Sequence, residues 1–169
     1  MDMKKSDLFP SDYPIDLYDR IVEDGAGENK FDVYRVSDVG TNNRDAFLCT
    51  YQTKMRSSIL NNRDAYIYNY NIETNYDIGF FSTSCFDEQK AAAKILKLIE
   101  KRVDSPKMLY GTIVPEHGLS MRTSESKSNR KSRKHHIDWW IYKDVDPSIN
   151  FCELEVEQNV HSQTILLRD

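Results

Sequence analysis

Alternating apolar and polar positions predict several short β-strands along the chain. Residues 31–36 place Phe31, Val33 and Arg35 on one face of a strand, with Tyr34 and Val36 on the other. Similar β-branched or aromatic stretches, bounded by turn residues, predict six more strands. They lie at 64–76, 77–84, 108–114, 137–142, 151–157 and 163–167.

Apolar residues at helical spacing predict two helices, and a third short one is expected over residues 15–22. Phe47, Tyr51 and Met55 lie four residues apart, which is typical of one helix face. A second helix is expected after Ser84, because Ser84 can cap it and Asp87 follows three residues later. Its apolar positions follow the i, i+3, i+4 pattern, and they are Ala92, Ile95, Leu96, Ile99 and Val103.

These elements predict an α+β fold in which two or three helices accompany a curved, mostly antiparallel sheet, whole or split. The length of 169 residues fits a single domain over residues 1–169. No stretch is long and apolar enough for a membrane span, and the first ten residues lack the apolar centre of a signal peptide. We therefore expect a cytoplasmic protein that has no membrane partner.

Cysteine usage predicts neither a disulfide framework nor a metal site. The three cysteines, Cys49, Cys85 and Cys152, are odd in number and far apart, and no CxxC pair occurs. Structural free thiols are the expected state of all three.

Residues 122–136 differ from the rest of the chain in composition. They contain six basic residues, one acidic residue and no apolar residue, whereas the whole chain has a net charge of −4. A mobile loop is predicted here. It is a plain solvated loop, a phosphate-binding segment, or a clamp for an acidic protein surface; the overall pI of about 5.6 favours a protein over a nucleic acid. The residues predicted to contact a partner are Arg130, Lys131, Arg133, Lys134, His136 and Trp139.

Three separated motifs suggest a catalytic constellation. They are Tyr34-Arg35, the Ser82-Thr83-Ser84 triplet, and the alternating Glu153, Glu155 and Glu157. In this order they resemble the arginine, Ser-Thr-Ser and Glu-x-Glu signature of the ADP-ribosyltransferase family. The aromatic residues before the triplet and the alanine-rich stretch after it add to the resemblance.

The resemblance implies a split antiparallel sheet that holds NAD in a cleft, with NAD as the donor substrate and a macromolecule as the target. Glu155 would be the catalytic glutamate, because a carboxylate stabilises the cation that forms when the bond between nicotinamide and ribose breaks. Glu153 would help to activate the acceptor, although Glu155 and Glu157 fit the same two positions equally well. Arg35 would bind the NAD diphosphate as a planar fork. The serine motif, Ser82, Thr83 and Ser84, would complete the NAD site, with Ser82 orienting the charged groups.

The segment from His135 to Trp140 has no place in this signature. Adjacent tryptophans on a strand put one ring on each face, so one is expected in the core and the other facing a cleft or a partner. His136 and Asp138 lie two residues apart, where a carboxylate can orient an imidazole as a general base of a hydrolase or phosphotransferase. They could also ligate a metal, but no further His or Cys lies at zinc-like spacing, so no metal site is predicted.

Two functions of different class remain. The first is an NAD-dependent ADP-ribosyltransferase. The second is a non-catalytic module that binds a protein, or less favourably a nucleic acid. It would use the basic loop, the tryptophans Trp139 and Trp140, and the row of Tyr66, Tyr68 and Tyr70 on one face of the predicted strand at 64–76.

Overall fold

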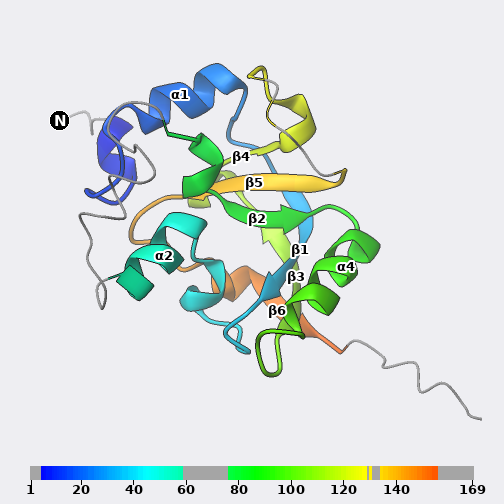
Figure 1. Cartoon of the computed structure of the whole chain (residues 1–169). Helices are drawn as coiled ribbons and strands as arrows, with labels where there is room; N and C mark the ends of the chain where they lie inside the picture. Colours follow the sequence, from blue (N-terminus) through cyan, green and yellow to red (C-terminus); the bar gives the residue numbers. More distant parts are fainter. Residues whose placement is uncertain (1–4, 59–75, 129, 131–133, 156–169) are drawn as a thin grey trace, which may run out of the picture.

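The computed structural model describes residues 5–58, 76–128, 130 and 134–155. Six strands form one open sheet in the order β4-β5-β2-β1-β3-β6 (Figure 1). Every pairing is antiparallel, which confirms the predicted α+β class and antiparallel sheet. The strands are β1 (Phe31–Ser37), β2 (Thr83–Phe86), β3 (Lys107–Ile113), β4 (Gly118–Arg122), β5 (His136–Ile141) and β6 (Phe151–Leu154).

Three α-helices and several short 3₁₀ turns complete the described part of the chain. The helices are α1 (Leu17–Asp24), α2 (Thr50–Ser58) and α4 (Gln89–Ile99). The 3₁₀ turns are η1 (Lys5–Leu8), η2 (Arg44–Phe47), η3 (Ile78–Phe81), η4 (Pro115–His117), η5 (Thr123–Glu125) and η6 (Pro147–Asn150). None of the helices within the described ranges has the length and apolar character needed to cross a membrane.

The two faces of the sheet carry different hydrophobic clusters. On one face, the β1 residue Val33 packs with residues of β2, β3 and β5 and with Phe47 of η2. The other face is covered in two parts: α1, α2 and η3 pack over β4 and β5, while α4 packs over β1, β2 and β3 (Figure 1). The second face therefore carries two separate hydrophobic clusters. The side chains of Ser84 and Asp138 lie on this face, where β2 and β5 pair.

The pairing between strands is shortest at the centre of the sheet. β1 and β3 pair over seven residues, whereas β1 and β2, both fully described, are in register at the single pair Tyr34 with Phe86. Arg35 helps to join the two halves, since its Nη1 donates a hydrogen bond of 2.9 Å to the Ser84 carbonyl oxygen. The halves β4-β5-β2 and β1-β3-β6 therefore meet between the strand of Arg35 and the strand of the serine motif.

Two local predictions around the serine motif are wrong. Residues 77–84 do not form one strand, because the Asp77 side chain accepts a hydrogen bond from the Gly79 backbone and stabilises η3 ahead of β2. Ser84 does not cap a helix either: it lies within β2, opposite Asp138 of β5, and α4 begins only at Gln89. Pairing with a strand more than 50 residues away in the sequence thus overrides the local capping signal.

The adjacent tryptophans lie on opposite faces of β5, as their positions predict. Trp139 packs in the cluster with Phe47 and Phe151, whereas Trp140 packs in the cluster with α1 and donates a hydrogen bond to the Ile78 carbonyl oxygen. Both rings are fully buried. Each therefore anchors one core, and neither faces a cleft.

Several predicted elements lie partly or wholly outside the described residues. They are the strand at 64–76, of which only Tyr76 is described, the last positions of the strand at 151–157, and the strand at 163–167. The described part of the β6 region ends its pairing at Leu154, and Glu155 follows as an exposed residue.

Candidate functional site

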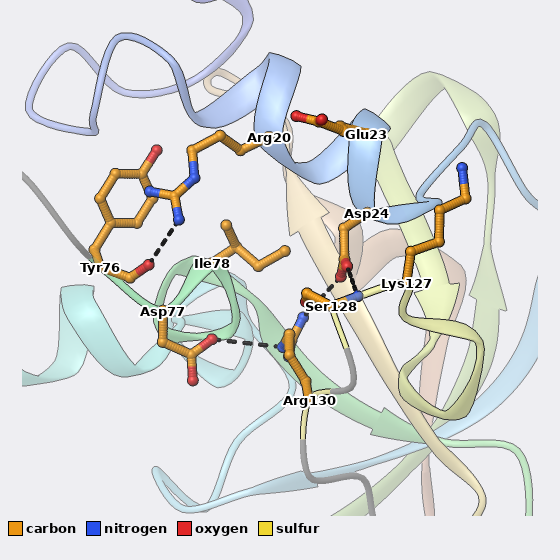
Figure 2. Close-up of a pocket in the computed structure, with 9 residues that line it drawn as sticks. All are labelled: Arg20, Glu23, Asp24, Tyr76, Asp77, Ile78, Lys127, Ser128 and Arg130. Carbon is orange, nitrogen blue, oxygen red and sulfur yellow. Dashed lines mark hydrogen bonds and ion pairs between the residues drawn. The ribbon is translucent and has the colours of Figure 1, made fainter.

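A pocket of about 450 Å³ lies between α1, the start of η3 and the segment that follows η5 (Figure 2). Its volume is within the range of small-molecule sites. The lining is mainly charged and polar, and consists of Arg20, Glu23, Asp24, Tyr76, Asp77, Ile78, Lys127, Ser128 and Arg130. Three cations and three carboxylates thus face one small volume.

Arg20 and Tyr76 form one wall of the pocket. The Arg20 guanidinium lies over the Tyr76 ring, 4.0 Å from its centroid, and also donates to the Tyr76 carbonyl oxygen at 3.2 Å. The Tyr76 hydroxyl donates in turn to Asp16 at 2.6 Å. Burial, together with this bond to Asp16, raises the pKa of Tyr76. The Tyr76 ring and carbonyl group therefore fix the orientation of the Arg20 guanidinium, which presents a planar cationic surface.

Asp24, at the C-terminal end of α1, holds the segment after η5 against the helix. Its carboxylate accepts hydrogen bonds from the Ser126 hydroxyl and from the Ser128 backbone N–H. Its backbone carbonyl oxygen accepts a hydrogen bond from the Lys127 backbone N–H. Burial alone would raise the pKa of Asp24, but the bonds from Ser128 and Ser126 outweigh it, and the pKa is lowered. The Asp24 carboxylate is thus charged, and both of its oxygens accept hydrogen bonds from within the protein.

Arg130 lies at the inner end of the pocket. Its Nη2 donates to Asp138 at 2.9 Å, its Nε lies 3.5 Å from an Asp77 oxygen, and its Nη1 lies 3.9 Å from an Asp24 oxygen. The side chain is 16% exposed, yet Nη1 is buried and has no hydrogen-bond partner within the described ranges. Three carboxylates therefore surround the guanidinium, and what it offers to a ligand in the pocket is its charge, because the enclosed Nη1 itself has no open surface.

Behind Arg130, Asp138 is the centre of a buried hydrogen-bond network on β5. It is 1% exposed, and it accepts hydrogen bonds from Ser82 at 2.6 Å, Thr123 at 2.7 Å and Arg130 at 2.9 Å. Charge-assisted bonds of this length are the strong kind. The network connects the end of η3, η5 and β5, and it fixes the position of the Arg130 guanidinium at the pocket.

Thr123 extends the network to His136. The Thr123 Oγ1 lies 2.6 Å from His136 Nδ1, and its only proton is donated to Asp138. Thr123 must therefore accept from His136, which places the imidazole proton on Nδ1. The hydrogen bonds run in one direction, from His136 through Thr123 to Asp138.

The structure brings together three residues that the sequence assigned to two different sites. Ser82, Arg130 and His136 all belong to the Asp138 network. The other members of the serine motif have structural contacts: the Thr83 hydroxyl donates to the Phe47 carbonyl oxygen, and Ser84 pairs with Asp138 in the sheet. In the structure, specific contacts join Ser126, Lys127 and Ser128 to α1, and Arg130 to Asp138.

Arg35 and the glutamates lie elsewhere. Arg35 and Glu153 both stand opposite Leu109, so they share the face that carries Val33, not the face of Ser82 and Asp138. Two of the three hydrogen-bonding nitrogens of Arg35 donate to backbone carbonyl oxygens of Ala46 and Ser84. Glu153 forms an exposed ion pair with Lys107 at 3.6 Å on the edge strand. These groups do not converge with Ser82.

The remaining predicted contact residues differ in exposure. Lys134 is exposed near α4, whereas the side chain of Trp139 is wholly in the core and presents no surface to a partner. Lys131, Arg133 and Glu157 lie outside the described residues. Glu155 is described and exposed.

The sequence does not predict that the acids Glu23, Asp24 and Asp77 and the aromatic Tyr76 line a pocket. Asp24 carries one local signal, since Gly25 follows it with a φ of 119° and ends α1. Nothing local connects it to Ser126 and Ser128, about a hundred residues later. Comparisons of the chain with models of known protein families, with curated proteins and with solved structures found no match.

Proposed function

We propose that this chain is an NAD-dependent ADP-ribosyltransferase-like protein whose NAD site is the charged pocket beside α1. The observation that carries the proposal is the connection from Ser82 through Asp138 to Arg130, which links the serine motif to a guanidinium that lines the pocket.

The charges of the pocket suit NAD in particular. NAD carries an anionic diphosphate and a cationic nicotinamide ring, and the pocket offers both cations and carboxylates. Arg130 would attract the diphosphate from the inner end of the pocket, and Lys127 would add a second cation from the rim. The face of Arg20 that does not contact Tyr76 would stack on a planar ring.

The reaction needs a carboxylate near the ribose. The bond between C1′ and the nicotinamide nitrogen breaks, both electrons leave with nicotinamide, and C1′ becomes cationic until the acceptor oxygen or nitrogen bonds to it. Glu23 and the 71%-exposed Asp77 are the reachable carboxylates of the pocket. They would stabilise the cation, and one would take the proton that the acceptor loses. Asp138 is a positioning residue here, because it acts through Arg130.

This assignment moves the proposed site away from Glu153 and Glu155. Nicotinamide release from NAD, measured by chromatography with the purified chain, tests it. Glu23→Gln and Asp77→Asn should together abolish release, whereas Glu155→Gln should leave it unchanged. Release that is lost in Glu155→Gln and kept in the double variant would place the chemistry at β6 instead.

Binding without chemistry is a second candidate function, favoured by the burial of Asp138. Asp138, the carboxylate bonded to the serine motif, is covered by Arg130 and is 1% exposed, so it does not reach a ribose in the pocket. In this case the chain would bind NAD and release no nicotinamide.

A further inference from the structure

A second surface feature lies on the other side of the basic segment, along α4. It is a groove of about 510 Å³ between α4 and the residues that lead into β5. We call it the α4 groove, and its lining consists of Phe86, Glu88, Lys90, Ala91, Lys94, Ile95, Leu98, Lys134 and His135. The groove shares no lining residue with the pocket beside α1.

The floor of the α4 groove is aliphatic and is not covered by the described part of the chain. α4 buries Ala92 and Leu96 against the sheet. The neighbouring Ala91 and Ile95 are partly buried against the same cluster, and Leu98 is 55% exposed. Leu98 therefore does not lie alone on the surface, because it lines a groove together with Ala91 and Ile95.

The rim of the groove is cationic. Lys90 and Lys94 lie one turn apart on α4 and are exposed, and Lys134 is exposed on the opposite side. Glu88 is the one acid of the lining, and it lies 3.4 Å from His135 Nε2. The lysines are therefore in excess, and a partner must bring negative charge to the rim.

We infer that the α4 groove binds an acidic amphipathic segment of a partner protein, with leucine-type side chains on the floor and carboxylates at the lysines. An aliphatic floor between charged rims is the pattern that binds an amphipathic helix. A nucleic acid fits less well, because it needs exposed aromatic rings for its bases, and Phe86, the aromatic residue of the lining, is 4% exposed. This inference stands apart from the proposed NAD site and does not depend on it.

A displayed library of random peptides, selected on the full chain and counter-selected on Leu98→Asp, tests this inference. The enriched peptides should combine Asp or Glu with Leu, Ile or Phe at helical spacing. In fluorescence anisotropy, Leu98→Asp and the double variant Lys90→Glu/Lys94→Glu should each weaken the best peptide by roughly tenfold or more. Leu98 is exposed, so its substitution should leave the fold intact, and circular dichroism should confirm this.

Two substitutions outside the groove serve as matched controls. Ile149→Asp replaces an aliphatic residue that is 78% exposed on η6, and Lys30→Glu reverses an exposed charge before β1. Neither should change the affinity by more than about twofold. Enrichment of basic peptides, no enrichment at all, or equal affinity for wild type and Leu98→Asp would each overturn the inference.

Discussion

The Ser82 hydroxyl lies 2.6 Å from a carboxylate oxygen of Asp138, although 56 residues separate them in the sequence. This contact joins the serine motif to β5, and through Arg130 it reaches the pocket beside α1. A residue that the sequence predicted as part of an NAD site and a segment that it predicted to bind a partner thus belong to one network.

Removal of the charge at Asp138 should destabilise the fold. Asp138→Asn leaves Arg130 with more distant acids and weakens the bonds from Ser82 and Thr123. We expect a loss of about 2–4 kcal/mol in the free energy of unfolding, measured by urea denaturation. Asp45→Asn is the control, because Asp45 pairs with Arg56 on the surface, and there the loss should be below about 1 kcal/mol. Equal losses at both positions would contradict the central role of Asp138.

Ser82 and Thr123 should be energetically coupled through their shared acceptor. Ser82→Ala and Thr123→Val each remove one hydrogen bond to Asp138. Each change should cost about 1–3 kcal/mol, and the double variant should differ from the sum by at least about 0.5 kcal/mol. Urea denaturation of the two single variants and the double variant gives the coupling. A strictly additive result would mean that the two hydroxyls act independently.

The stability that Asp24 contributes should depend on pH. The pKa of Asp24 is lower in the folded chain than in the unfolded chain, where an aspartate titrates near about 3.9. Its contribution is therefore complete above about pH 4 and is lost as the pH falls through the folded-state pKa. Asp24→Asn should destabilise the fold more at about pH 7 than at about pH 3, as measured by urea denaturation at both values. A pH-independent effect would contradict the assigned bonds from Ser126 and Ser128.

The three cysteines should differ sharply in reactivity. Cys85 is fully buried, and burial raises the pKa of its thiol to about 12. Burial also raises the pKa of Cys49, whereas Cys152 is exposed on β6. A thiol reagent at neutral pH should therefore modify one cysteine in the native chain and all three in denaturant. Rapid modification of Cys85 in a Cys152→Ser variant would show that the core around β2 opens readily.

The sequence alone could predict elements whose signals are local. The i, i+3, i+4 spacing of Ala92 and Leu96 predicts α4, and the alternation around Val33 and Trp139 predicts β1 and β5. The predicted helix start at Ser84 is wrong, because Ser84 belongs to one of four residue pairs between β2 and β5, and this pairing outweighs a local helix cap.

The candidate site depends on contacts between distant parts of the chain. Ser126 bonds Asp24 across 102 residues, and nothing at either position signals the other. The basic composition of residues 122–136 correctly marks an unusual segment, but it does not show that Arg130 turns inward to buried acids. Charge composition indicates which residues are available for pairing and leaves their partners open.

The most direct test of the proposed site is a calorimetric titration of NAD into the full chain and three variants. The wild type and Glu155→Gln should bind NAD with the same affinity, since Glu155 is remote from the pocket. Arg130→Gln should weaken binding by roughly tenfold or more, because the diphosphate loses its charged partner, and Arg20→Gln should weaken it less. No NAD binding by the wild type, or unchanged binding by Arg130→Gln, would contradict the assignment of the pocket as an NAD site.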